Sequence, residues 1–181
     1  EPTLESEDIS ERIRRDMARE FFILPWGKIY RRDFLLENKI AFPQMRFAED
    51  VTFCFKCLCL AKNYVRIPHV TNIHRYRKGS AAQMIPVTKR EGLRVWLNIL
   101  TKNISMLDEF MGGLEINPDL RCDSGHYYIG LHFGMIENLF KNVKPQDVQR
   151  IFFEELKNPE LNQSGKNIVA AYLYAERALT R

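Results

Sequence analysis

The feature that most constrains the fold is the helical character of the chain from Thr88 onward. Thr88 and Glu91 have the spacing of a capping box, which opens a predicted helix that continues to about Phe110. Met111-Gly112-Gly113 interrupts this helix, and the later helices begin near prolines or a glycine. We expect them at about Pro118 to Asn142, Pro145 to Lys157 and Gly165 to Thr180. These helices are enough for a bundle over residues 87–181.

Residues 1–86 have a mixed pattern, so the expected class is α/β with a majority of helix. Apolar periodicity and capping residues predict helices from Ser6 or Asp8 to about Phe22, from Arg32 to Asn38 and from Asp50 to Ala61. The helix after Asp50 is apolar on nearly all sides, which indicates burial. Asn63 to Ile67 and Val70 to Tyr76 have the composition of strands joined by a turn at Pro68. We therefore predict two domains, 1–86 and 87–181.

The overall composition favours a folded protein that can hold an anion. With 181 residues, 45% of them hydrophobic, the chain can bury one sizeable core or two small ones. Basic residues cluster at 12–15, 31–32 and 75–78, which suits a diphosphate or a membrane surface. No nucleic-acid motif accompanies them.

No apolar run reaches the ~18 residues of a membrane span. Because the first residue is Glu1 and not Met, we interpret the sequence as a piece of a longer protein.

Three of the four cysteines lie in one predicted helix. Cys54 and Cys57 share a face of it, Cys59 points elsewhere, and Cys122 is distant in sequence. A disulfide-stapled domain spreads its cysteines between loops, so this distribution favours a reducing cytosol. Cys54-x-x-Cys57 could also indicate zinc or redox chemistry, but no second Cys or His pair stands at ligand spacing. Buried packing is the favoured interpretation.

Three polar clusters, within about 55 residues, are separated by apolar segments. The central cluster is Glu49-Asp50, at the start of the predicted buried helix. A carboxylate there is stabilised by the positive end of the helix dipole, stays ionised and can accept a proton from a hydroxyl. A simple helix cap is the alternative.

The first cluster runs from Pro25 to Arg32 and contains Trp26, Gly27 and Lys28. Gly27 allows a close backbone approach, and Trp26 offers a flat apolar face on which a sugar ring can stack. The alternative is a surface turn anchored by its aromatic residue.

The third cluster runs from His74 to Ser80. Strand alternation would place Arg75 and Arg77 on one face, where two guanidinium groups can clamp phosphate oxygens. A solvated basic edge strand is the alternative. Elsewhere, His126 and His132 lie six residues apart on a predicted helix and do not share a face, so we expect structural roles for both.

The order and spacing of the three clusters resemble the second half of the catalytic domain of family 2 glycosyltransferases, which have the GT-A fold. The resemblance covers residues 24–84 and is carried by Gly27 to Arg32, Phe42-Pro43 and Glu49-Asp50-Val51-Thr52-Phe53. It implies the C-terminal part of a GT-A fold, followed by an α-helical extension. It further implies that Asp50 is the general base and that Glu49 helps to place the acceptor.

The same resemblance implies that Trp26 and Lys28 contact substrate, Lys28 pointing to the site while Tyr30 packs. Arg75, Arg77 and Ser80 would contact the donor diphosphate. The parent enzyme would be an inverting hexosyltransferase of polysaccharide biosynthesis. It would move a sugar from a nucleotide diphosphate donor to a soluble or lipid-linked saccharide. This reaction would take place at the cytoplasmic face of the membrane. The helical extension is expected to bind the acceptor, the membrane or another subunit, for example in a homodimer.

Such an enzyme holds Mg²⁺ or Mn²⁺ with an Asp-x-Asp pair, and this sequence contains none. We therefore expect no metal to be held by this chain alone, and the isolated chain to be inactive. A second hypothesis from a different class is a noncatalytic helical module whose basic clusters bind an acidic partner.

Overall fold

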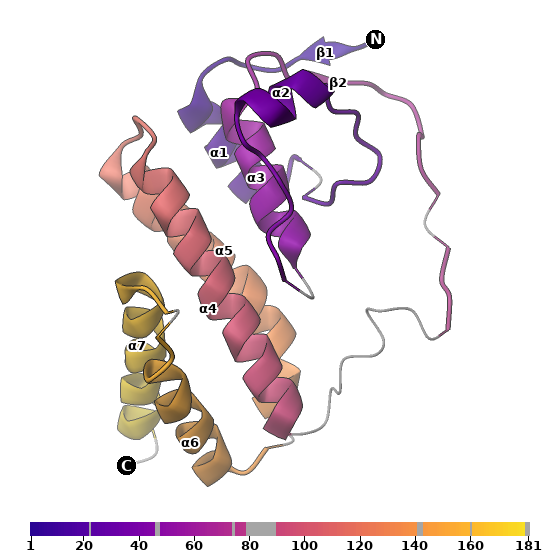
Figure 1. Ribbon diagram of the computed structural model, residues 1–181. Helices are drawn as coiled ribbons and strands as arrows, with labels where there is room; N and C mark the ends of the chain where they lie inside the picture. Colours follow the sequence, from indigo (N-terminus) through magenta and orange to yellow (C-terminus); the bar gives the residue numbers. More distant parts are fainter. Residues whose placement is uncertain are drawn as a thin grey trace. The chain divides into compact units, whose positions relative to one another are not determined.

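The computed structural model describes residues 1–21, 23–45, 48–73, 75–78, 90–140, 143–159 and 161–179. The fold is mostly helical, as the sequence predicts (Figure 1). Its elements are, in order, β1 (Thr3–Leu4), α1 (Ile9–Met17), α2 (Arg32–Glu37), α3 (Glu49–Leu60), β2 (Val65–Arg66), α4 (Arg90–Gly112), α5 (Pro118–Phe140), α6 (Pro145–Leu156) and α7 (Gln163–Leu179). None of the described helices combines the length and the apolar character needed to cross a lipid bilayer.

The chain divides into two compact units that are not contiguous in sequence. The first unit comprises Glu1–Tyr76 and Phe110–Ser124, and the second comprises Arg77–Glu109 and Gly125–Arg181. The domain boundary predicted after residue 86 falls outside the described residues, as does the capping residue Thr88.

In the first unit, α1 packs against α3 through an apolar and a charged contact. Asp8 caps α1 by accepting a hydrogen bond from the backbone N–H of Ser10 at 2.8 Å. Ile13 of α1 is fully buried, and beside it the buried Arg12 donates hydrogen bonds to backbone carbonyls of Leu58, Ala61 and Lys62. These carbonyls lie at the C-terminal end of α3, where helical carbonyls have no partners within the helix. Arg12 therefore joins the two helices.

The helix α3 is buried on nearly all sides, in agreement with its apolar sequence. Phe53, Cys54 and Cys57 form a core cluster with Ile40, and Tyr30 packs against this cluster. Cys54, Cys57 and Cys59 are buried free thiols, which confirms that this cysteine-rich segment packs as a helix.

Of the two predicted strands, the structure contains one. β2 lies inside the predicted strand Asn63–Ile67 and pairs antiparallel with β1, with Thr3 opposite Arg66. The described residues of Val70–Tyr76, which are 70–73 and 75–76, form no strand, so that prediction is wrong for them. The strand alternation that would align Arg75 with Arg77 is therefore absent from the described residues.

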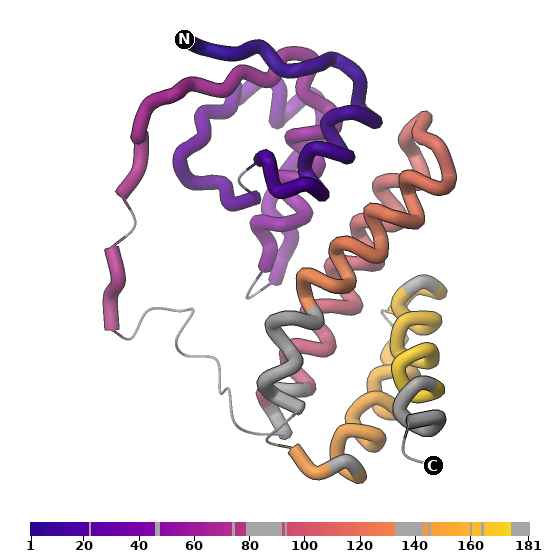
Figure 2. The backbone as a smooth tube through the Cα atoms, turned by 180° about the vertical axis from the view of Figure 1, so that it is seen from behind, coloured from indigo at the N-terminus to yellow at the C-terminus, as the bar shows by residue number. Residues whose placement is uncertain are grey.

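The second unit is built from helices in the order that the sequence predicts. Figures 1 and 2 show α4 and α5 running side by side and antiparallel, and α6 and α7 forming a second hairpin. Its core contains Leu100, Ile151 and Val169, and Phe152 of α6 stacks on Tyr172 of α7 with ring centroids 4.2 Å apart. Phe152 and Tyr128 belong to this core, whereas Phe153 and Tyr174 are exposed.

Candidate functional site

The turn at Trp26-Gly27 lies against the segment that follows β2. Gly27 has a φ of 75°, a conformation that disfavours residues with a Cβ. A Cβ atom built on Gly27 would lie 3.5 Å from the Thr71 hydroxyl oxygen and 3.9 Å from the Asn72 Cβ. The positive φ is therefore what favours glycine at this position, since a Cβ atom would make only ordinary van der Waals contacts with Thr71 and Asn72.

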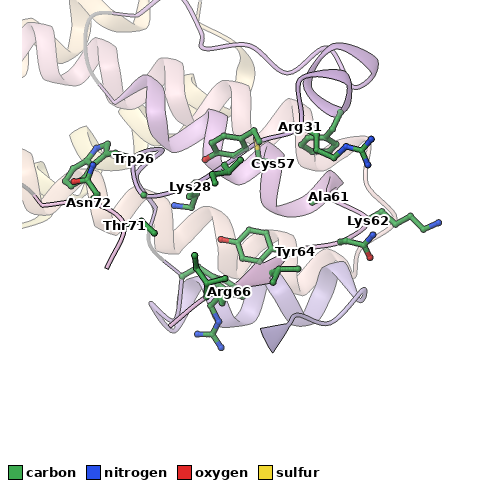
Figure 3. A pocket seen from close by; sticks show the side chains of 18 of the residues that line it. Trp26, Lys28, Arg31, Cys57, Ala61, Lys62, Tyr64, Arg66, Thr71 and Asn72 are labelled. Atoms are coloured by element: carbon green, nitrogen blue, oxygen red, sulfur yellow. The ribbon is translucent and has the colours of Figure 1, made fainter. Parts of the chain in front are cut away.

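Beside this turn the first unit contains an open cavity of about 1250 Å³. The cavity is lined by the segment from Trp26 to Arg31, by the C-terminal end of α3 and by residues between Ala61 and Asn72. Figure 3 shows Trp26 next to Asn72 on one side, and Arg31 and Lys62 on the other. Trp26 is 37% exposed and lines this cavity. The structure thus brings Trp26 and Lys28, two predicted substrate-binding residues, to one cavity.

Lys28 is half-buried in the wall of this cavity. Its Nζ donates a hydrogen bond to the backbone carbonyl of Leu24. Burial lowers the pKa of Lys28, while negative charge on Cys54 or Asp16 would raise it. A half-buried ammonium group of this kind is stabilised by an anion that enters the cavity.

Tyr30 packs into the protein, as the sequence predicts. Its ring meets that of Phe53 edge-to-face with centroids 5.3 Å apart, and its hydroxyl lies 3.9 Å from the Cys54 Sγ. Burial raises the pKa of the Tyr30 hydroxyl well above its usual range. Tyr30 is therefore a neutral packing residue.

The carboxylate pair Glu49-Asp50 occupies the first turn of α3, as predicted. The preceding residue, Ala48, is in the left-handed conformation with a φ of 57°, which is strained for a residue with a Cβ. Asp50 is half-buried, and this desolvation, together with the negative charge of Glu49, raises the pKa of its carboxyl group. Hydrogen bonds from the backbone N–H groups of Val51 and of Asp50 itself act in the opposite direction.

A carboxylate with a raised pKa is a stronger base than an ordinary one, and so it is suited to general base catalysis. Neither Asp50 nor Glu49 lines the cavity that contains Trp26 and Lys28. The sequence predicts their position on the helix but not this separation from the cavity.

The remaining predicted site residues belong to the third cluster. Arg75 and Arg77 are exposed, and neither lines the cavity. Ser80 and His74 lie outside the described residues.

Sequence reasoning did not identify Tyr64, Thr71 and Asn72, which line the cavity. The sequence feature that could have indicated these residues is Pro68, which predicts a turn after β2. A strand over Val70 to Tyr76 would not place Thr71 and Asn72 in a loop, whereas in the structure both are loop residues next to Gly27.

Charged residues around the cavity are partly paired. The buried Glu5 carboxylate binds both Arg15 and Arg66, and Arg15 also pairs with Glu20 at 2.8 Å. Arg66 and Glu20 therefore each contribute a compensated charge to the cavity wall.

The metal site that the resemblance implies is built on an Asp-x-Asp pair. Among the described residues, no three His, Cys, Asp or Glu side chains come together in a group that could hold a metal ion. The full sequence contains no Asp-x-Asp pair. We therefore assign no chemical step to a metal bound by this chain. No protein-family model, no curated protein and no solved structure matches the chain.

Proposed function

We propose that this chain is part of an inverting glycosyltransferase that moves a hexose from a nucleotide diphosphate donor to a saccharide or lipid-linked acceptor in polysaccharide biosynthesis. The proposal starts from the resemblance carried by the three polar clusters. In this proposal the chain supplies the general base and part of the substrate site, within the C-terminal part of a GT-A fold. Mg²⁺ or Mn²⁺ and the donor nucleotide would be held by the rest of the parent protein.

The observation that carries the proposal is the state of Asp50. It stands at the start of a buried helix, half-desolvated and next to Glu49, and its raised pKa makes its carboxylate a better proton acceptor. In the proposed reaction an Asp50 carboxylate oxygen takes the proton of the acceptor hydroxyl as that oxygen attacks the anomeric carbon. The bond from that carbon to the diphosphate breaks on the opposite face, so the configuration inverts.

Two further residues support a saccharide substrate. Trp26 exposes part of its indole ring, and Lys28 places an ammonium group in the same cavity. An aromatic face binds the apolar face of a sugar ring, and a lysine can bind an anionic group. Arg75, Arg77 and Ser80 keep their proposed role as ligands of the leaving diphosphate.

The proposal is tested by replacing Asp50 in the intact protein that contains this chain. Asp50→Asn removes the proton acceptor while keeping the size of the side chain, and we expect transfer to fall about a hundredfold to ten-thousandfold. Because the pKa of Asp50 is raised in the folded state, the ionised carboxylate lowers the free energy of unfolding at pH 7. The Asp50→Asn variant should therefore be at least as stable as the unmodified protein at pH 7.

The matched control is Asp147→Asn. Asp147 is also an acidic residue in the first turn of a helix of twelve residues, and it pairs with Arg150 at 2.8 Å. Transfer should be unchanged in this variant. Turnover of Asp50→Asn within a factor of two of the unmodified protein would show that Asp50 is not the base.

The exposure of Arg75 and Arg77 favours one second candidate, a noncatalytic helical module that binds an acidic partner. In that case, Arg75→Glu with Arg77→Glu would abolish capture of the partner, and no sugar nucleotide would bind to the intact protein. Sugar nucleotide binding by the intact protein would exclude this candidate.

A further inference from the structure

We propose that this chain forms a homodimer in which the outer edge of β2 pairs with the same edge of a second copy. The two-stranded sheets of the two chains would then join into one sheet of four strands. This inference goes beyond the proposed function, and its test requires neither Asp50 nor a sugar. It assigns the dimer contact to the first unit and not to the helices of the second.

The outer edge of β2 is the side of the strand that faces away from β1. Thr3 of β1 stands opposite Arg66 of β2. Two residues earlier in the chain, the carbonyl of Tyr64 accepts a hydrogen bond from the backbone N–H of Glu5 at 2.8 Å. Because the backbone groups of an antiparallel strand point alternately to its two sides, the N–H and C=O of Val65 point away from β1.

This outer edge has no partner strand in the part of the chain that the structure describes. Asn63 and Ile67 alternate with the residues that bond to β1, so they continue the edge on either side of Val65. Among the described residues, no backbone hydrogen bond to Asn63, Val65 or Ile67 comes from another strand or loop. All three residues line the open cavity of the first unit. An unpaired strand edge of this kind is a template for pairing with another strand.

The side chains beside this edge are apolar and exposed. Val65 and Ile67 are both exposed, and the cavity lining also contains Ile29 and Val70, which are 97% and 86% exposed. Single exposed aliphatic residues are common on any protein, but several that gather around one cavity indicate an interaction surface. A second copy of β2 that pairs along the edge would cover these side chains.

The sequence around Val65 is suited to pairing with itself. With a two-fold axis at Val65, the two Val65 residues exchange both of their backbone hydrogen bonds. Arg66 then stands opposite Tyr64 of the second copy and not opposite a second arginine, so no like charges meet across the strands. An axis two residues earlier or later would bring the end of α3 or the bend at Pro68 into the pairing. The axis at Val65 is therefore the one that the chain allows.

The charges around the cavity also permit two copies to meet. The lining includes Arg31 and Lys62 as well as Asp33 and Glu37 (Figure 3). Because both signs are present, opposite charges of two copies can face each other. Each cavity would gain a wall from the other copy, so a substrate beside Trp26 would lie between the two chains.

The experiment is sedimentation velocity of the full 181-residue chain. Concentrations from about 1 to about 200 μM span the dissociation constant expected of a small interface. We expect the weight-average mass to rise over this range toward twice that of the chain. A chain that stays monomeric at every concentration would overturn the inference.

Val65→Pro then assigns the contact to the edge of β2. It removes the N–H that points to the second copy and keeps the ladder to β1, which uses the neighbouring residues. We expect the dimer of a folded Val65→Pro variant to be at least about tenfold weaker.

The matched control is Leu4→Pro. Leu4 stands opposite Val65, so its N–H points to the other edge of the sheet, and the dimer should be unchanged in this variant. A dimer that is as strong in Val65→Pro as in the unmodified chain would mean that another surface forms it.

A cross-link tests the same register with a smaller change to the strand. Val65→Cys, in a Cys122→Ser background that removes the exposed thiol, places two thiols at a hydrogen-bonded pair. The Cα atoms of such a pair lie about 5.5 Å apart, within the range that a disulfide spans. On oxidation with copper phenanthroline we expect a covalent dimer from Val65→Cys and mainly monomer from Leu4→Cys in the same background. If Val65→Pro is unfolded, equal yields from these two cysteine variants would overturn the inference instead.

Discussion

His132 shows how one residue serves the fold without serving a site. It is buried in the second unit, where its Nδ1 lies 2.7 Å from the backbone carbonyl oxygen of Tyr128 and its Nε2 lies 3.3 Å from the amide nitrogen of Asn103. The carbonyl requires a proton on Nδ1, and the amide can donate to an unprotonated Nε2. The neutral ring therefore satisfies both partners, as expected for a structural histidine.

The first prediction concerns the pH dependence of stability. Burial lowers the pKa of His132 in the folded state below its ordinary value of 6.5. Below pH 6.5 the unfolded chain binds a proton that the folded chain binds less readily, so the free energy of unfolding should fall as the pH drops through this value. One such group contributes at most about 1.4 kcal/mol per pH unit.

Urea unfolding between pH 7.5 and 5.5 measures this effect. His132→Gln should flatten the dependence. A pH dependence that is the same in His132→Gln and in the unmodified protein would contradict the assignment.

At the residue scale, the sequence predicts the burial of a side chain better than its backbone conformation or its neighbours from distant parts of the chain. The burial of Cys54 and Cys57 follows from their apolar neighbours, and the packing of Tyr30 is also confirmed. The left-handed conformation of Ala48 could not be predicted, because alanine has no preference for it and only the surrounding chain can impose it. The separation of Asp50 from the cavity of Trp26 depends likewise on long-range packing.

At the scale of elements, Arg12 shows how the C-terminal end of α3 is satisfied. Arg12 is 1% exposed, and its guanidinium group donates to three carbonyls at or just beyond the end of that helix and to the carbonyl of Ser6. The buried charge of Arg12 is tolerated because its N–H donors bind carbonyls that have no partner within the helix.

The second prediction is that Arg12→Met destabilises the chain by on the order of 3 kcal/mol, because the buried carbonyls lose their donors. Arg14→Met on the exposed face of α1 should change stability by less than about 0.5 kcal/mol. Guanidinium unfolding measured by circular dichroism compares the two variants. Equal stabilities would show that Arg12 does not hold α1 to α3.

The helices could be predicted from the sequence because their signals are local. Asp8 caps α1, Pro145 begins α6, and the glycines after Phe110 mark the end of α4. A strand also requires a partner, which local composition cannot provide. β2 finds one in β1 from the start of the chain, whereas the described residues of Val70–Tyr76 pair with no strand among the described elements.

At the scale of the whole molecule, the division into two units could not be predicted from composition. The change in character near residue 86 predicts two consecutive domains, and that boundary stays a prediction. In the structure, Phe110–Ser124 belongs to the first compact unit. This segment packs there through Phe110, whose ring meets that of Phe55 edge-to-face with centroids 6.1 Å apart. A contact between residues so distant in sequence leaves no local signal.

The third prediction uses the thiols as reporters of the folded first unit. Cys54, Cys57 and Cys59 are buried, and burial raises the pKa of Cys54 to about 11 and that of Cys57 to about 12. Only Cys122, which is exposed, should react rapidly with Ellman's reagent at pH 7.5. All four thiols should react in denaturant.

The control for this count is Cys122→Ser, which should show no rapidly reacting thiol in the folded state. A second fast thiol in the folded, unmodified chain would mean that the core around α3 is open to the reagent.

The proposal that Asp50 is the general base is tested most directly by the pH dependence of kcat/KM for transfer. This dependence is measured for the intact protein and for its Glu49→Gln variant. Because burial and the charge of Glu49 both raise the pKa of Asp50 above its ordinary value of 3.8, activity should be lost on the acid side at a pH above that value. Glu49→Gln removes one of the two causes, so this acid limb should move to lower pH. An acid limb that stays in place in Glu49→Gln, or moves to higher pH, would contradict the assignment of Asp50 as the base.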